Sequence, residues 1–299
     1  MSRVYKATGI NLRSMPLGEA DRLLTILTRE YGLIKAVAPG CRKPKSSLGG
    51  RSALFVVNEL LMVQGRSLDK ISQAESLESY PGLSQNLAKL TASQYLAELV
   101  LYQALSGQPQ AELWELFCQQ LTLLQRADPH QIPYYLVIGI LQLLEEAGVG
   151  PQVQTCCLTQ QPLTPDRRDP TWRVGFSPQA GGTITLSALA SQSPSPPLHL
   201  RERAGPKGER GLGPIRLTME ELFLLQQLSH SLTDGGDLVD HASLNLSMAE
   251  QALPLATWQG VEFALRHYAE AYFGKPIRSA ALIDTCFTAL LDLPSPVQL

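Results

Sequence analysis

Residues 23–38 read LLTILTREYGLIKAVA, and this stretch specifies the centre of the first domain. Residues 23–29 are rich in leucine, isoleucine and threonine, and residues 33–38 alternate between apolar and other side chains. Between them, Glu30, Tyr31 and Gly32 supply a turn. Two short β-type segments joined by a turn that contains glycine predict a β-hairpin.

Three further segments within the first 80 residues have strand character. They cover residues 4–12, 54–63 and 68–75. On the first of these, we expect Val4, Thr8, Ile10 and Leu12 to share one face, a pattern that Lys6 interrupts. Five short strands joined by Gly- and Pro-containing connections predict a small barrel. A five-stranded barrel of this size is typical of the OB-fold, which frequently binds single-stranded nucleic acid.

The spacing of apolar residues changes after Pro81 and Gly82, from a strand period to a helix period. The predicted helices cover residues 83–105, 113–124 and 134–147. We expect the second helix to stop before Asp128 and Pro129, because a residue that precedes proline is disfavoured in the helical region. Gly148 is expected to end the third helix.

The rest of the chain combines irregular segments with helices. Residues 150–190 show no regular period, and we expect an irregular segment. Residues 191–216 are dense in Pro, Gly and Ser, which predicts a flexible insertion of about 25 residues. Further helices are expected after Thr218, which forms a capping-box pattern with Glu221. Others are expected from Thr257 to Gly274 and over residues 279–291.

These patterns together predict an α+β protein with two domains. Residues 1–80 would form an OB-fold nucleic-acid-binding domain, and residues 81–299 a mainly helical domain. A length of 299 residues is too great for one small core, which agrees with this division.

Composition indicates a soluble globular chain, with 44% hydrophobic and 17% charged residues. No apolar run reaches the roughly 18 residues that span a bilayer, and residues 1–14 lack the pattern of a signal peptide. The five cysteines have no disulfide-framework spacing. We therefore expect free thiols and a cytoplasmic, nucleoid-associated protein that does not contact a membrane.

Sequence patterns of common enzyme sites are absent. The chain has no phosphate-loop motif, no nucleophile elbow and no paired-histidine zinc motif. Its five histidines also lack the spacing of metal ligands. We expect a protein that is not an enzyme and that holds no cofactor.

Positive charge gathers in the first 80 residues. They hold twelve Lys and Arg against seven Asp and Glu, a net charge of +5, so the remainder carries −7. No acidic residue occurs from Tyr31 to Asn58. Five cations fall in the segment KAVAPGCRKPKSSLGGR of residues 35–51, which we expect to contain a mobile loop between the third and fourth strands. Such a loop suits phosphate binding.

Two other interpretations stay open at this point. The cationic loop could simply keep the protein soluble. Alternatively, the chain could be an adaptor whose helical body docks partner proteins or peptides, with the barrel mainly structural. Charge reversal in the loop separates a DNA-binding protein from an adaptor. It should abolish DNA binding in the first case and leave partner binding intact in the second.

Aromatic residues are scarce in the predicted barrel. The first 80 residues contain only Tyr5, Tyr31, Phe55 and Tyr80. Tight binders of single strands usually stack bases on several aromatic rings. We therefore expect binding here to be mainly electrostatic, which would leave base faces free to pair with a second strand.

Three motifs of the first domain resemble the amino-terminal signature of the RecO family, bacterial recombination mediators of DNA repair. They are Glu19-Ala20-Asp21-Arg22-Leu23, Thr28-Arg29-Glu30-Tyr31-Gly32 and Arg42-Lys43-Pro44-Lys45-Ser46. The resemblance continues more weakly along the chain through Pro162-Leu163 and Gly181-Gly182, and it leaves out residues 191–216.

The resemblance implies a function and a set of partners. A RecO-like protein would bind single- and double-stranded DNA and anneal complementary strands. It would work with RecR, so that RecA replaces single-strand-binding protein at gaps. It would also contact the acidic carboxyl-terminal tail of the single-strand-binding protein.

Many members of the family carry a zinc loop with two C-x-x-C pairs, and this chain departs from that pattern. The four matching positions hold Cys156, Thr159, Thr185 and Ala188. A structural zinc site needs four Cys or His ligands. We therefore predict no zinc, and a zinc-loop-like segment over residues 150–190 held by packing of Trp172, Val174 and Phe176.

Candidate DNA-binding residues follow from the recognised motifs and from charge. The predicted set is Arg13, Arg22, Arg29, Lys35, Arg42, Lys43, Lys45 and Arg51. Some of these could instead pair with Glu19, Asp21 or Glu30, and we expect Arg22 to be more structural than Lys43. Arg201, Arg203, Lys207 and Arg210 of the insertion could add a second contact, although a solvated tether is favoured.

Overall fold

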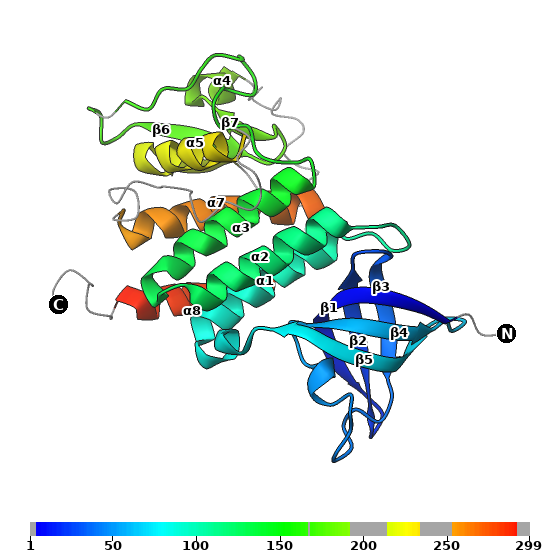
Figure 1. The fold of residues 1–299 in the computed structure, drawn as a ribbon. Helices are drawn as coiled ribbons and strands as arrows, with labels where there is room; N and C mark the ends of the chain where they lie inside the picture. Colours follow the sequence, from blue (N-terminus) through cyan, green and yellow to red (C-terminus); the bar gives the residue numbers. More distant parts are fainter. Residues whose placement is uncertain (1–3, 167, 192–213, 234–252, 292–299) are drawn as a thin grey trace, which may run out of the picture. The chain divides into compact units, whose positions relative to one another are not determined.

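The computed structural model describes residues 4–166, 168–191, 214–233 and 253–291 (Figure 1). Two compact units emerge from the contacts. One unit comprises Met1–Tyr135 together with Arg278–Leu299, and the other comprises Leu136–Ile277. The predicted division after residue 80 stays a prediction, since the barrel and the first helices fall in one unit.

The first unit begins with a closed five-stranded barrel in the order β1-β2-β3-β5-β4, shown in blue and cyan in Figure 1. Its strands are β1 (Val4–Leu17), β2 (Asp21–Thr28), β3 (Gly32–Ala38), β4 (Val56–Val63) and β5 (Asp69–Ser79). The β1–β2, β2–β3, β1–β4 and β4–β5 pairs are antiparallel, and β3 meets β5 in parallel. The predicted OB-fold barrel is confirmed.

Strand β1 is longer than predicted, because it pairs with two neighbouring strands. Its first half pairs with β4 and its second half with β2, and the register shifts between Asn11 and Arg13. On the face expected to hold Val4, Thr8, Ile10 and Leu12, Ile10 and Leu12 are buried, but the start of the strand differs. Tyr5 packs against the barrel core, whereas Val4 is 55% exposed. Barrel closure, which depends on β4, decides this orientation.

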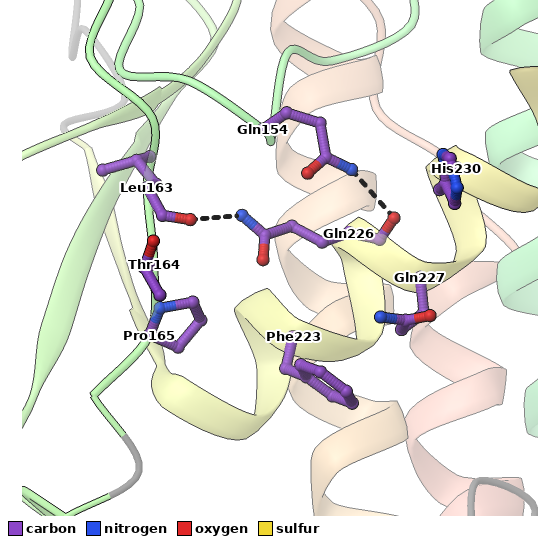
Figure 2. A pocket seen from close by; sticks show the side chains of 8 residues that line it. All are labelled: Gln154, Leu163, Thr164, Pro165, Phe223, Gln226, Gln227 and His230. Carbon is purple, nitrogen blue, oxygen red and sulfur yellow. Dashed lines mark hydrogen bonds between the residues drawn. The ribbon is translucent and has the colours of Figure 1, made fainter.

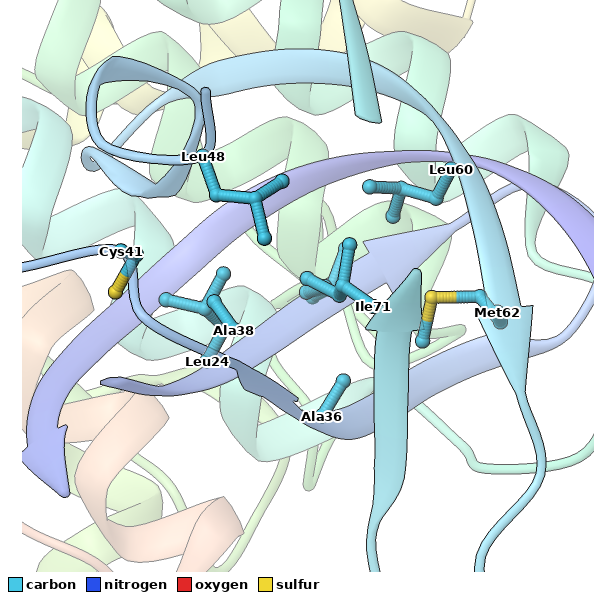
Figure 3. Close-up of a cluster of buried hydrophobic side chains, with 9 residues drawn as sticks. Leu24, Ala36, Ala38, Cys41, Leu48, Leu60, Met62 and Ile71 are labelled. Carbon is cyan, nitrogen blue, oxygen red and sulfur yellow. The ribbon is translucent and has the colours of Figure 1, made fainter. Parts of the chain in front are cut away.

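The barrel interior is filled by small and branched side chains (Figure 3). The buried cluster consists of Leu24, Ile26, Ala36, Ala38, Cys41, Leu48, Leu60, Met62 and Ile71. Two of these, Cys41 and Leu48, lie outside the strands, in the connection between β3 and β4. That connection is therefore anchored in the core at two points, and it contains the short 3-10 helix η1 (Gly50–Ser52).

Helices follow the barrel, and the first is shorter than predicted. A 3-10 turn, η2 (Pro81–Gln85), precedes α1 (Leu87–Gln103). The Asn86 side chain ends the turn and caps the helix, accepting hydrogen bonds from the amides of Ala88 (2.9 Å) and Lys89 (3.2 Å). This cap breaks the expected 23-residue helix, because Asn86 adopts an extended conformation.

The second helix, α2 (Ala111–Arg126), ends before Asp128 and Pro129, as predicted. A 3-10 turn, η3 (Pro129–Gln131), leads into α3 (Ile132–Glu146). Gly148 follows α3 with a φ of 71°, which confirms its expected place at the helix end. In the first unit, α1 packs against α2 and against α8 (Ala280–Leu291).

The second unit contains a small sheet that the sequence did not predict. It has the order β7-β6-β8, with β6 (Arg173–Ser177), β7 (Gly182–Ile184) and β8 (Ile215–Thr218). The expectation of a wholly irregular segment over residues 150–190 is therefore wrong, as is the expected end of the insertion at residue 216. These strands have only three to five residues, and β8 pairs with β6 across a long stretch of sequence.

Helices α4 (Leu186–Ser191), α5 (Met219–Thr233) and α7 (Leu255–Phe273) complete this unit. The capping box is confirmed: Thr218 Oγ1 accepts from the Glu221 amide (3.2 Å), and Glu221 Oε2 accepts from the Thr218 amide (2.8 Å). The predicted cap at Thr257 is wrong, because α7 begins at Leu255 and Thr257 is buried inside it. Gly274 ends α7 in the left-handed conformation, as predicted.

Most of the expected insertion, residues 192–213 with Arg201, Arg203, Lys207 and Arg210, lies outside the described residues. Among the helices of the described ranges, none is long and apolar enough to cross a membrane.

Candidate nucleic-acid interface

The outer face of strands β1, β2 and β3 carries two of the predicted cations. Thr25 lies opposite Arg13 on one side and opposite Lys35 on the other, so the three side chains share a face. The neighbouring residues of β2, Leu24 and Ile26, fill the barrel core, which places this row outside the barrel. Arg13 and Lys35 are both exposed. A polyanion lying across these strands would meet both charges.

The predicted cationic loop between β3 and β4 is a succession of turns, and we call residues 39–51 the basic loop. Backbone hydrogen bonds join Lys43 to Gly40 (3.0 Å), Ser46 to Lys43 (3.2 Å) and Gly49 to Ser46 (3.2 Å). With Cys41 and Leu48 buried in the core, this loop is more constrained than the mobile loop expected from the sequence. Its cations Arg42, Lys43 and Lys45 are exposed.

The turn between β1 and β2 holds the start of the basic loop. Asp21 Oδ1 accepts a hydrogen bond from the Gly40 amide (2.7 Å). The Arg42 amide donates to Ala20 O (2.9 Å), and Arg42 Nη1 donates to Gly18 O (2.9 Å). The basic loop therefore lies at the Asp21 end of β2, next to the face that carries Arg13 and Lys35.

Besides Arg42, whose guanidinium donates to Gly18 O, three predicted DNA-binding residues have structural partners. Arg29 forms an ion pair with Glu115 of α2, and its guanidinium lies 5.2 Å from the ring centroid of Trp114. Arg51 Nη1 donates to Ser47 O (2.7 Å) within the basic loop. The half-buried Arg22 donates from Nη1 to Ser14 Oγ (3.5 Å). No interaction with an acidic side chain is shown for Arg22 in the described ranges.

Two of the three acidic residues considered as partners for these cations, Asp21 and Glu30, have other roles. Asp21 accepts from Gly40, and Glu30 Oε2 accepts from the Thr8 amide (2.9 Å). Within the part of the chain that the structure describes, Arg29 is the one predicted cation that forms an ion pair with an acidic side chain. Charge on Arg13, Lys35, Arg42, Lys43 and Lys45 is thus available to an external anion. Whether each of the eight predicted residues touches DNA stays a prediction.

Of the four aromatic residues in the barrel region, two are removed from any interface. Phe55 and Tyr80 are buried, with 3% and 6% of their surface exposed. Tyr31 is 39% exposed, and Tyr5 is half-buried beside it. Their rings meet edge to face with a centroid distance of 4.9 Å. Among the aromatic residues of the described barrel, residues 4–80, this pair is the one that could contact a base.

The zinc-loop-like segment lies in the second unit, and its residues do not fit a zinc ion. Cys156 Sγ accepts from the Thr185 amide (3.4 Å) and lies 3.8 Å from Thr185 Oγ1. The fourth matching position is Ala188, which has no ligand atom. In the described residues, no group of three or more His, Cys, Asp or Glu could hold a metal. One thiol and two hydroxyls are a poor donor set for zinc.

Hydrogen bonds at Cys156 stabilise its thiolate. Burial raises the pKa of this thiol, but hydrogen bonds from the Thr159 hydroxyl and from the amides of Thr185, Thr159 and Leu158 outweigh burial and lower it to about 6. Packing also holds the segment, because Val174 and Phe176 are buried. Trp172, the third residue expected there, is only half-buried. All five cysteines of the chain carry free thiols.

A pocket of about 440 Å³ lies in the second unit, beside α5 (Figure 2). Gln226 Nε2 donates to Leu163 O (2.9 Å) and Val153 O (2.9 Å), and Gln154 Nε2 donates to Gln226 O (3.0 Å). These amides tie the preceding loop to α5. The pocket is lined by amide, hydroxyl and apolar side chains with His230, and by none of the predicted DNA-binding residues.

A closed five-stranded barrel with exposed cations on its outer face defines an OB-fold protein of a class that commonly binds nucleic acids. Comparison with known families agrees. Residues 1–80 match the family model "Recombination protein O N terminal", and residues 84–194 match "Recombination protein O C terminal".

Relatives along the whole chain carry the same name. The chain is 63% identical over 300 residues to the DNA repair protein RecO of Acaryochloris marina, with 99% of each chain covered. It is 54% identical to the RecO of a Cyanothece strain, with 97% of this chain and 98% of the relative covered. The chain therefore belongs to the RecO family, which places it in DNA repair and recombination.

Sequence reasoning missed two features of this interface. It did not find Glu115 as the partner of Arg29, because Glu115 lies 86 residues away and no local pattern connects them. It also missed the role of Asp21 as an anchor for the basic loop, although the short spacing between Asp21 and Gly40 across one hairpin could have suggested it.

Proposed function

We propose that this chain is a DNA-binding mediator that holds single- and double-stranded DNA through phosphate contacts. The observation that carries the proposal is the set of five exposed cations on the outer face and the basic loop: Arg13, Lys35, Arg42, Lys43 and Lys45. Cations that neutralise phosphates release counterions, so binding should weaken steeply as salt rises. Such contacts do not read base sequence.

We also propose that the protein anneals complementary strands, because most of the interface offers charge and few aromatic rings, which leaves bases free to pair. Membership of the RecO family supports further roles. Together with RecR, the protein would help RecA replace single-strand-binding protein at gaps, and it would contact the acidic tail of the single-strand-binding protein. It would do so in the cytoplasm near the nucleoid, without bond-making catalysis.

The test is binding of a labelled single strand across a salt series. We compare the native protein with a variant that carries Arg42→Glu, Lys43→Glu and Lys45→Glu. For a single strand, the logarithm of the binding constant falls with the logarithm of the salt concentration with a slope of about −0.7 per phosphate contacted. Loss of three contacts should therefore flatten this salt slope by about 2. Strand annealing is then measured with the same pair of proteins.

A matched control corrects for net charge. Arg126→Glu, Lys275→Glu and Arg278→Glu change the charge equally at exposed positions outside the barrel. We expect this control to keep a near-native slope. If both variants behave alike, or if the native protein binds weakly at low salt, the proposal is wrong and the adaptor function of the helical body becomes the better account.

A further inference from the structure

A second feature of the barrel lies at the opposite end of β2 from the basic loop. Strand β3 pairs with β5 only through Ala36–Asp69 and Val37–Lys70, so the first half of β3 separates from β5. A pocket of about 560 Å³ occupies this opening, within the range of small-ligand sites. It lies entirely within the first unit.

The pocket combines aromatic, polar and cationic groups. Tyr5 and Tyr31 form one wall, and Ile34 adds an apolar surface. Tyr31 is 39% exposed, so part of its ring is open to a flat partner. Gln64 and Ser67 supply hydrogen-bonding groups from the loop between β4 and β5. An exposed ring beside polar side chains suits a nucleobase, which has a flat face and a polar edge.

Charges at the pocket are arranged to admit a phosphate on one side. Lys35 lines the pocket, is exposed and forms no ion pair within the described ranges. The single acidic group, Asp69, accepts hydrogen bonds from the Tyr5 hydroxyl and from the Gly65 amide (3.0 Å). Burial and the neighbouring Asp69 raise the pKa of Tyr5, so its hydroxyl stays a donor to that carboxylate.

The turn that carries Tyr31 is held rigidly. The Leu33 amide donates to Leu105 O (2.8 Å), and the Gly107 amide donates to Tyr31 O (2.9 Å). Gly32 has a φ of 62°, and a Cβ there would lie 2.1 Å from Leu105 O. Because the ring is already in place, a ligand would pay little ordering entropy on binding.

The pocket continues the cationic face. Lys35 belongs both to the pocket and to the row with Arg13, and the eight residues of β2, at about 3.3 Å each, span roughly 25 Å between the basic loop and Tyr31. A bound strand that follows β2 from the basic loop would therefore reach Tyr31 after several nucleotides, which agrees with the about 4–16 nucleotides that OB-folds cover.

We propose that this pocket holds one unstacked nucleobase of a single strand that lies along β1, β2 and β3, with the base stacked on Tyr31 and the adjacent phosphate beside Lys35. This inference rests on the proposed function and deepens it. The protein then anchors one base and leaves the others free to pair.

The test compares Tyr31→Leu with Tyr31→Trp in binding of a short oligothymidylate. Tyr31→Leu should bind oligothymidylate about 5- to 150-fold more weakly than the native protein, because one base is no longer stacked. The salt slope should not change, because no phosphate contact is lost. Tyr31→Trp keeps a stacking face and should bind within a few-fold of native. The control is Tyr272→Leu, which removes another exposed tyrosine, on α7, and should bind as native. Thermal melting confirms that each variant is folded.

A strand of abasic sugar phosphates supplies the second readout. Native protein and Tyr31→Leu should bind this strand equally, because it has no base to stack. Equal binding of oligothymidylate by native and Tyr31→Leu would overturn the inference, even if the basic-loop variant loses binding and the proposed function stands. If thymidine monophosphate binds at Tyr31 without competing with the strand, the pocket serves a free nucleotide and the inference is again overturned.

Discussion

The carboxylate of Asp21 accepts a 2.7 Å hydrogen bond from the backbone amide of Gly40, which joins the start of β2 to the start of the basic loop. A negative charge thus supports a surface that we propose for DNA binding. Simple electrostatics and loop positioning predict opposite effects when this carboxylate is removed.

We expect Asp21→Ala to weaken DNA binding several-fold although it removes a negative charge, because the basic loop loses its anchor. A hydrogen bond to a charged group contributes about 1.5–3 kcal/mol, so the free energy of unfolding should also fall. Asp21→Asn keeps an acceptor and should restore most of the affinity. Exposed Glu19 provides the control: Glu19→Ala should bind slightly more tightly. Tighter binding by Asp21→Ala would contradict the anchoring role.

Arg29 and Lys43 should behave differently when each is changed to alanine. Arg29 pairs with Glu115 and contacts Trp114, but both charged side chains are nearly half exposed, so the loss of stability should be at most about 1 kcal/mol. The salt slope of DNA binding by Arg29→Ala should equal that of the native protein. Lys43→Ala should keep native stability and flatten the slope by about 0.7. The opposite assignment of the two effects would show that Arg29, and not Lys43, contacts phosphate.

Stability should depend on pH through Cys156. Its pKa is lowered from 9.0 to about 6 in the fold. Between these values the unfolded chain binds more protons, so the contribution of Cys156 is fully present above pH 9 and is lost as pH falls through 6. The free energy of unfolding of the native protein relative to Cys156→Ala should therefore rise from pH 6 to pH 9, by at most about 4 kcal/mol.

Cys118 is the control for that measurement. Burial raises the pKa of its thiol, so it stays protonated in the folded and largely in the unfolded chain below pH 9. The difference in free energy of unfolding between the native protein and Cys118→Ala should stay constant from pH 6 to pH 9. A flat profile for Cys156→Ala as well would refute a stabilised thiolate at that position.

Metal analysis of the purified full chain should find far less than one zinc per molecule. The four family positions supply one thiol, two hydroxyls and no fourth ligand, at Cys156, Thr159, Thr185 and Ala188. A chelator should leave the melting temperature unchanged, since the segment is held by packing and hydrogen bonds. Near-stoichiometric zinc that survives dialysis would overturn this prediction.

Gly32→Ala and Gly18→Ala form a matched pair. Both glycines have φ near 60°, a conformation that costs other residues about 1–2 kcal/mol. A Cβ at Gly18 meets nothing within 4 Å, whereas one at Gly32 would lie 2.1 Å from Leu105 O. Gly18→Ala should lower the free energy of unfolding only by this conformational cost. Gly32→Ala should lower it by clearly more, because the added Cβ also clashes with Leu105 O. Equal melting temperatures would show that the loop after α1 yields easily.

Local patterns were enough for much of the fold. The hairpin of residues 23–38, the stop before Asp128 and Pro129, and the capping box of Thr218 and Glu221 each depend on residues close in sequence, and all are confirmed. The sheet of β6, β7 and β8 was missed because its strands are short and its pairing is non-local. Asn86 was missed as a cap because the apolar period continues through it.

Residue order alone established the five strands of the barrel, most of the helices, the concentration of positive charge near residues 35–51 and the family, because these are properties of short, contiguous patterns. Folding in three dimensions settled which charges are available. Arg29 is engaged by Glu115, Arg51 turns back to Ser47, and Lys35 joins Arg13 across β2. Ion pairs and sheet faces depend on which distant segments meet, and periodicity carries no information about that.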